Sequence, residues 1–227
     1  MENKNHINWV TFLLAWVAGY CDTVTFVSGD SIFSAHVTGN FIVFAAQTVT
    51  GGSADSWVKL LTFPVFVCAV IIGGWIANDP QKRYKLLLTE GILLLLSGIA
   101  AVMLPLLGYV EGKLCTYLIV MVVVFGMGLQ NAFGRLFAKE THGPTTMMTG
   151  NVTQASLDIG NLLREGFFTG SIAWQSLKKQ GYTIGGFLIG CLLGAVFSKI
   201  WGLPVIFLPG VFLLVCYRMG TKSNLVE

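Results

Sequence analysis

Long apolar segments separated by short polar connections account for most of the chain. Their lengths, about 15 to 22 residues, are close to what an α-helix needs to cross a hydrocarbon core about 30 Å thick. The last segment is short for a span and contains Pro204 and Pro209, so its ends are poorly defined. The pattern predicts an all-α, polytopic integral membrane protein with about six transmembrane helices, at 9–27, 58–77, 86–107, 114–134, 181–199 and 204–218.

The composition excludes a soluble or disordered protein. Hydrophobic residues make up 54% of the 227 residues and charged residues 11%, against about 25% charged in soluble domains. The five cysteines have no paired spacing, so we expect no disulfide and no metal site, and no motif indicates a cofactor, a catalytic centre or nucleic-acid binding. We therefore expect one membrane domain over residues 1–227, in which the apolar run from Trp9 is a retained helix and not a signal peptide.

Two less apolar segments, at 34–50 and 145–163, share the tripeptide Thr-Gly-Asn. The two triplets are 111 residues apart, and Asp22 and Asn131 precede them at nearly the same spacing. The order of elements recurs as well: a helix that ends in a polar residue, a Thr-Gly-Asn segment, a glycine-rich helix and a final helix. This shared order predicts an internal duplication.

We place repeat one at about 9–107 and repeat two at about 114–218, with three spans in each. Because three is an odd number, the two repeats have opposite orientations in the membrane. With the N-terminus inside, only Lys59, Lys113 and Lys199 of the 14 Lys and Arg residues fall outside. Basic residues concentrate in cytoplasmic loops, so we expect a multi-pass protein with both termini in the cytoplasm.

Each Thr-Gly-Asn segment is predicted to form a half-helix or re-entrant segment that points into the protein. Glycine permits a tight turn, and Thr and Asn are good N-cap residues. The first copy leaves about ten residues before Gly51, or about 15 Å of helix, which is half of the hydrocarbon core. Two opposed helix N-termini would form a central site for an anion, a carboxylate or a polar solute. The alternative is a capped helix that lies flat at the membrane interface.

Polar side chains in and near these segments are the candidate site residues. Asp22 lies deep in the first span, where an acid usually faces a cavity or a partner, but it could equally cap a neighbouring helix near the outer interface. His36 precedes the first triplet and titrates near neutral pH. The predicted substrate-binding residues are Thr38, Gly39, Asn40, Thr149, Gly150 and Asn151, and the predicted pathway-lining residues are Asp22, His36, Gln47, Gln130, Asn131 and Asp158.

Two further features have a structural interpretation. Glu90 follows Lys82, Arg83 and Lys85, so we expect an ion pair at the membrane interface. Glycines at 186, 190 and 194 have the spacing that lets helices approach closely, and we expect them to pack within the chain in preference to forming a dimer.

The motifs resemble those of the YoaK family of small bacterial membrane proteins, a domain of unknown function. The similar residues are GYCD at 19–22, FSAHVTGN at 33–40, GMGLQN at 126–131 and TTMMTGN at 145–151, and the resemblance extends over about 9–218. It implies a bacterial inner-membrane protein with about six spans. It implies no substrate and no activity.

The leading hypothesis is a membrane transporter or channel for a small solute, which is not an enzyme. Its partners would be the lipid bilayer and the solute, and a homodimer is compatible with six short helices. The main alternative is a non-transporting subunit, scaffold or regulator that binds a protein partner through its glycine-rich helices. A third hypothesis, an intramembrane enzyme, has Asp22 and His36 as its single candidate pair.

Overall fold

The computed structural model describes residues 2–52, 54–78, 84–108, 113–166 and 170–223, and every regular element in these ranges is a helix. Two 3-10 helices, η1 (Ala54–Trp57) and η3 (Leu203–Ile206), lead into the third and the last α-helix. The all-α prediction is therefore confirmed. The α-helices are α1 (Glu2–Ser28), α2 (Gly39–Val49), α3 (Val58–Ile76), α4 (Lys85–Leu106), α5 (Lys113–Leu136), α6 (Met148–Glu165), α7 (Ile172–Trp201) and α8 (Phe207–Ser223).

Five of the described helices are long and apolar enough to cross a membrane. The predicted sixth span corresponds to η3 and most of α8, an apolar stretch at Leu203–Arg218 that is shorter than the other five. The chain is therefore a helical membrane protein with several apolar helices of spanning length. These five stretches are Asn5–Ser28, Ala54–Ile76, Lys85–Leu106, Lys113–Leu136 and Ile172–Trp201.

The most extensive interface lies between α1 and α7. Glycines bring the two backbones together: a Cβ added to Gly186 would lie 2.5 Å from the carbonyl oxygen of Phe12, and one added to Gly190 would overlap the carbonyl oxygen of Trp16. Gly19 on α1 meets the backbone of α7 in the same way. The prediction that the α7 glycines pack within the chain is confirmed.

A second set of interfaces joins α3, α4, α5 and α8. Helix α5 packs against α3 and α4, and α4 also packs against α8. Gly128 lets α5 approach α3, since a Cβ added there would lie 2.5 Å from the Cβ of Ala69. Helices α4 and α8 cross where Gly91 meets Gly210, and a Cβ on Gly210 would lie 2.8 Å from the carbonyl oxygen of Gly91. The first helix of each predicted repeat, α1 or α5, thus packs against α7 or α3 of the other repeat.

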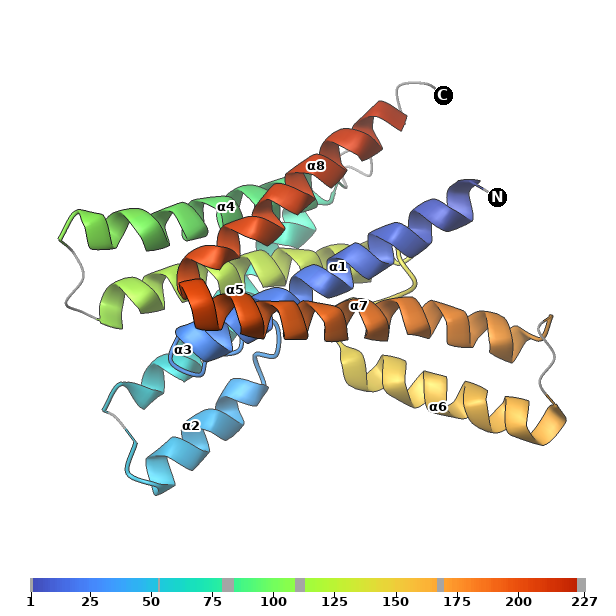
Figure 1. The fold of residues 1–227 in the computed structure, drawn as a ribbon, viewed down its shortest axis with the longest axis horizontal. Helices are drawn as coiled ribbons and strands as arrows, with labels where there is room; N and C mark the ends of the chain where they lie inside the picture. Colours follow the sequence, from blue (N-terminus) through green and yellow to red (C-terminus); the bar gives the residue numbers. More distant parts are fainter. Residues whose placement is uncertain (1, 53, 79–83, 109–112, 167–169, 224–227) are drawn as a thin grey trace.

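The two Thr-Gly-Asn helices lie on different neighbours, because α2 packs against α3 and α6 packs against α7. In Figure 1 the starts of both helices face the middle of the molecule, and from there α2 runs to the lower left and α6 to the lower right. The start of α1 and the end of α8 lie at the same end of this view.

The structure corrects the predicted lengths of two elements. Helix α2 has 11 residues, as a half-helix should, but α6 has 18, about 27 Å, and is not a half-helix. Helix α7 begins at Ile172, well before the predicted start at 181, and α6 packs along this early part (Figure 1). The predicted capping is also wrong: Thr38 occupies the N-cap of α2 without a side-chain capping hydrogen bond, and Thr149 lies inside α6.

Candidate functional site

A pair of ionisable side chains, a buried aspartate and a partly exposed histidine, lies where α1 meets the loop before α2. Asp22 on α1 is 4% exposed, and its Oδ2 atom lies 2.6 Å from Nδ1 of His36. Its Oδ1 atom accepts hydrogen bonds from the backbone N–H groups of Ala35 at 2.7 Å and His36 at 3.3 Å. Asp22 therefore orients the His36 ring and also holds the backbone of the loop before α2.

The pair favours a protonated His36. The hydrogen bond to Asp22 raises the pKa of His36 above its ordinary value; partial burial acts in the opposite direction, and the charge of Asp22 adds to the increase. The His36 side chain is 39% exposed, and no described residue accepts a hydrogen bond from its Nε2 atom. One ring nitrogen is therefore held by Asp22, and the other remains available.

A cavity of about 470 Å³ lies against this pair, between α1, α2 and α7. Its wall is predominantly apolar, and its polar contribution comes from Asp22, Thr23 and His36. The ring centroid of His36 is 5.7 Å from that of Phe187, which brings α7 into the wall. The cavity is lined by Asp22, Thr23, Phe26, Phe33, His36, Gly39, Ile42, Val43, Phe187 and Cys191.

The first Thr-Gly-Asn triplet shapes the loop that carries His36. Asn40 is fully buried, and its side-chain amide donates hydrogen bonds to the Phe33 carbonyl at 2.8 Å and to Oγ1 of Thr62 at 3.0 Å. Its Oδ1 atom accepts from the Phe33 N–H at 2.8 Å. Both amide donors of Asn40 are therefore used within the protein.

The start of α2 offers few free donors to an anion. The backbone N–H groups of Gly39, Asn40 and Phe41 donate to carbonyl oxygens of the residues three positions earlier. Of the triplet, Gly39 lines the cavity beside Asp22, whereas Thr38 and Asn40 are not among its lining residues. His36, not the N-terminus of α2, is thus the group best placed to meet a ligand there.

The second triplet has a similar local structure. The Asn151 amide donates hydrogen bonds to the carbonyl oxygens of Pro144 and Met147, both at 3.1 Å. Pro144 lies seven residues before Asn151, as Phe33 lies seven residues before Asn40. In both copies the asparagine therefore closes the loop that precedes its own helix.

The polar residues near the ends of α1 and α5 hold these two loops. Asp22 accepts from the N–H of Ala35, and the Asn131 amide donates to Oγ1 of Thr146 at 2.7 Å. Ala35 and Thr146 are 111 residues apart, the spacing of the two triplets. Gln130 is fully buried and donates both to this second loop and to a backbone carbonyl of α1.

Gln47 and Asp158 occupy matching positions on α2 and α6, but neither lines the cavity beside Asp22. Asp158 is 4% exposed; its Oδ1 atom accepts from the Gln154 amide at 3.0 Å, and its Oδ2 atom has no hydrogen-bond partner. The side-chain oxygen of Gln47 is likewise buried without a partner. The structure does not bring these two side chains together with Asp22 and His36.

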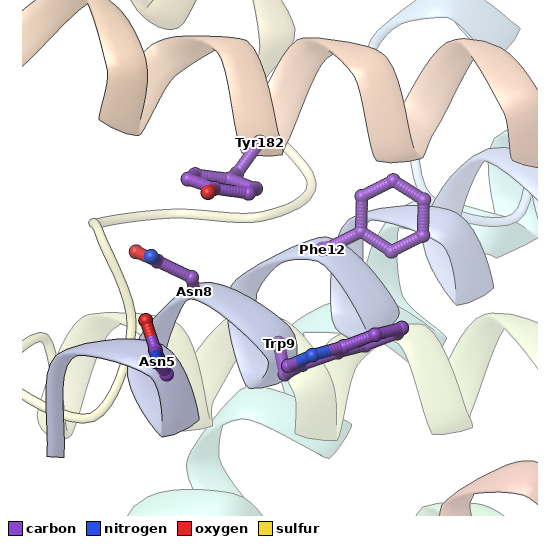
Figure 2. Close-up of a pocket in the computed structure, with 5 residues that line it drawn as sticks. All are labelled: Asn5, Asn8, Trp9, Phe12 and Tyr182. Atoms are coloured by element: carbon purple, nitrogen blue, oxygen red, sulfur yellow. The ribbon is translucent and has the colours of Figure 1, made fainter. Parts of the chain in front are cut away.

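A smaller cavity of about 330 Å³ lies between the start of α1 and α7 (Figure 2). Asn8 and Phe12 project from α1 and Tyr182 from α7. Nearby, Nε2 of His142 lies 2.6 Å from Oδ1 of Asn8, and burial together with the charge of Lys179 lowers the pKa of His142. His142 therefore favours its neutral form, whereas His36 favours its protonated form.

A third cluster of polar side chains, Asp30, Lys59 and Tyr117, connects the end of α1 to α3 and α5. Oδ2 of Asp30 lies 3.2 Å from Nζ of the fully buried Lys59 and accepts a 2.9 Å hydrogen bond from Tyr117. Burial acts to raise the pKa of Asp30, but hydrogen bonds from Tyr117 and Lys59 and nearby positive charges outweigh it and lower that pKa. Asp30 and Ser31 both have positive φ angles, 61° and 59°, which are uncommon outside glycine.

A family model described as protein of unknown function (DUF1275) matches residues 10–219. The chain belongs to this family. No curated protein and no solved structure matches it. The membership is consistent with the YoaK-like motifs, and it places both Thr-Gly-Asn segments and the Asp22–His36 pair inside the region that defines DUF1275. The family description states no activity, so the function of this DUF1275 protein has to be argued from its site.

Sequence reasoning missed the buried charged groups of this DUF1275 chain. Glu90 was expected to pair at the membrane interface, but it is fully buried and neither of its carboxylate oxygens has a hydrogen-bond partner. Lys82 and Arg83, two of its expected partners, lie outside the described residues. The available signal was a single carboxylate within a leucine-rich span. Among the described residues, no group of three or more His, Cys, Asp and Glu side chains could hold a metal.

Proposed function

We propose that this DUF1275 protein is a transporter or channel for a small solute, which binds in the cavity beside Asp22 and His36. The observation that carries the proposal is a buried aspartate hydrogen-bonded to a partly exposed histidine in the wall of a cavity of about 470 Å³ in a helical membrane protein. An acid within an apolar helix is costly, and it typically faces a pathway or a partner. Asp22 is hydrogen-bonded to a partner, His36, and its side chain also lines the cavity.

The lining favours a small organic carboxylate with an apolar body as the solute. A protonated His36, held by Asp22 through Nδ1, presents its second N–H as a charge-assisted donor to a carboxylate. The rings of Phe26, Phe33 and Phe187 offer an apolar surface to the rest of the molecule. This proposal keeps the carboxylate of the sequence hypothesis but moves its recognition from Asn40 to His36.

Two inverted repeats of three spans, with α8 as the sixth span, are part of the proposal. The support comes from matched contacts: Asn40 with Phe33 corresponds to Asn151 with Pro144, at a common spacing of 111 residues. The exchange of partners, α1 with α7 and α5 with α3, and the crossing of α4 with α8 are what a two-fold relation between the halves would produce. Such repeats are common in secondary transporters, whose sites lie between the halves.

The alternatives receive less support. A partner-binding protein would use glycine-rich faces, but Gly186 and Gly190 are covered by α1. An enzyme would need a nucleophile beside the histidine, and no described Ser, Thr or Cys side chain is hydrogen-bonded to His36. We further propose that the protein lies in the bacterial inner membrane with both termini in the cytoplasm, from the distribution of its basic residues.

The test is counterflow of labelled carboxylates in proteoliposomes that contain the purified protein. The panel is lactate, pyruvate and phenylpyruvate, which differ in the size of the apolar body. We expect counterflow of at least one, with loss in Asp22→Asn and His36→Gln. The matched control is His6→Gln, because His6 is an exposed histidine on α1 outside the cavity. Equal counterflow in His36→Gln and the wild type would contradict the site, and no counterflow of any of the three would contradict the proposed solute class.

A further inference from the structure

Glu90 lies on α4 where this helix meets α5 and α8. A Cβ on Gly126 of α5 would lie 3.7 Å from Cγ of Glu90, and the next residue, Gly91, lies against Gly210 and Leu213 of α8. On the α1 side, Cys21, the neighbour of Asp22, lies within electrostatic range of the Glu90 carboxyl group. Glu90 is therefore close to the helix that carries the solute cavity, although it is not among the residues that line the cavity.

Among the described residues, the carboxyl group of Glu90 has no ionic or hydrogen-bond partner. The side chain is 0% exposed, and neither Oε1 nor Oε2 has a hydrogen-bond partner. On α1, Cys21 lies within electrostatic range of Glu90 and forms no hydrogen bond with it. None of the described titratable groups on the other helices that pack against α4 donates a hydrogen bond to Glu90; they are Lys59 and Cys68 on α3, Lys113, Cys115, Tyr117 and Arg135 on α5, and Cys216, Tyr217 and Arg218 on α8.

A charged carboxylate that is buried among apolar helices without a partner has a high free energy. A protonated, neutral carboxyl group is more stable in that position. Two further buried oxygens without partners lie on the same helix pair: Oγ of Ser97, two turns along α4, and Oε1 of Gln130, one turn beyond Gly126 on α5. Each is an acceptor that a protonated carboxyl or a water molecule could satisfy when the helices move. The Gln130 amide points to α1 and the loop before α6, where Nε2 donates to the Leu14 carbonyl and to Oγ1 of Thr145, so α4 and α5 each carry a buried polar oxygen with unused hydrogen-bonding capacity besides Glu90.

We infer that Glu90 is a proton-binding site, and that its proton couples solute movement to a proton gradient. The carboxylate takes up one proton from water on one side of the membrane and becomes a neutral acid, the form suited to its buried position in the contact between α4, α5 and α8. It returns that proton to water on the other side when the contact opens. The inference rests on the proposed transport function for its coupling, whereas proton binding by Glu90 stands independently.

Infrared difference spectroscopy of the full chain in lipid nanodiscs tests the proton. A protonated carboxyl absorbs at a C=O frequency distinct from that of a carboxylate. We expect this signal at neutral pH in the wild type, its loss in Glu90→Gln, and its retention in Glu165→Gln. Glu165 is the matched control because it is an exposed carboxylate in an ion pair with Arg164. Absence of the signal in the wild type, or its persistence in Glu90→Gln, would overturn the inference.

Transport in proteoliposomes tests the coupling with labelled phenylpyruvate as the probe. Glu90→Gln should keep phenylpyruvate counterflow but lose accumulation driven by an imposed pH gradient. Asp22→Asn should lose both, which distinguishes failure of the solute site from failure of the proton site. Gradient-driven accumulation in Glu90→Gln equal to the wild type would overturn the coupling. If no phenylpyruvate moves, the coupling to this solute is overturned, and the infrared signal still decides whether Glu90 binds a proton.

Discussion

Nδ1 of His36 lies 2.6 Å from Oδ2 of Asp22, and the two residues are fourteen positions apart on opposite sides of a tight loop. Asp22 also holds the backbone of this loop at Ala35, so one carboxylate positions both the ring and the loop. The pair forms one wall of the cavity between α1, α2 and α7. A change in the charge of either residue should therefore alter both the protonation of His36 and the shape of the cavity.

The first prediction concerns the pKa of His36. Asp22→Asn removes the carboxylate that raises this pKa, so the pKa of His36 should fall toward or below its ordinary value. The measurement is an NMR titration of histidine-labelled protein in nanodiscs, with His6 and His142 as internal references. His142 should titrate below an ordinary histidine in both proteins, because burial and Lys179 lower its pKa. An unchanged pKa of His36 in Asp22→Asn would contradict the charge pair.

The second prediction is the pH dependence of stability. Because the folded state raises the pKa of His36, the pair contributes stability below the pKa of an ordinary histidine, and this contribution is lost as pH rises through the raised value. The difference in Tm between the wild type and His36→Gln should therefore be largest at mildly acidic pH and shrink at alkaline pH. A difference that grows with pH would show that neutral His36 is the form that stabilises the fold.

The third prediction separates the two asparagines of the triplets. Asn40→Leu leaves the N–H and the carbonyl of Phe33 without partners, at roughly 1–3 kcal/mol for each buried group. Asn151→Leu removes donors alone, since Asn151 accepts no hydrogen bond from the loop before it. Denaturant unfolding in detergent should therefore show a larger loss for Asn40→Leu. Equal losses would indicate that the Phe33 N–H finds another acceptor.

The fourth prediction uses two neighbouring glycines of α7. Gly190→Ala places a Cβ against the carbonyl oxygen of Trp16 and should destabilise the protein by about 1–3 kcal/mol. Gly185→Ala meets no atom within 4 Å and should be neutral or stabilising, because alanine favours a helix by up to about 1 kcal/mol. Unfolding of the two variants under the same conditions is the measurement. A stable Gly190→Ala would mean that α1 and α7 are farther apart than described.

The fifth prediction concerns Asp30 and the buried Lys59. Asp30→Asn tolerates the same positive φ but leaves Lys59 without its counter-charge, whereas Lys59→Met removes the buried charge itself. Asp30→Asn should therefore lower the Tm more than Lys59→Met. The cost should stay below the roughly 3–5 kcal/mol typical of fully buried pairs, because the Asp30 side chain is 32% exposed. A larger loss in Lys59→Met would show that the ammonium is needed for more than this pair.

The sequence predicts the spans and the loops better than it predicts the buried charges. Hydropathy locates the apolar helices because each side chain contributes independently. The 111-residue spacing points to Asn40 and Asn151 because local hydrogen bonds are repeated, and Asp22 and Asn131 precede them at a nearly equal spacing. Glu90 was misassigned because charge clusters near it in sequence, whereas its surroundings are set by α5 and α8. Which helices meet is a property of tertiary packing that no single segment encodes.

The start of α7 was misplaced for a similar reason. Gln175, Lys178 and Lys179 read as a loop by hydropathy, yet they belong to a helix that begins at Ile172 and packs against α6. The Ser171 side chain caps this helix by accepting from the N–H of Trp174 at 3.2 Å. A serine cap four positions before Gln175 was the one sequence signal for the true start.

Cysteine labelling in intact cells tests whether the two halves of the chain have opposite orientations in the membrane, as an inverted repeat requires. Single cysteines replace Thr50, after the end of α2, and Glu165, at the end of α6, in a chain whose five native cysteines are substituted. Both positions are exposed in the structure. The inverted repeat predicts that a membrane-impermeant thiol reagent labels Thr50→Cys from outside and labels Glu165→Cys only after the cells are opened. Labelling of both positions from the same side would contradict it.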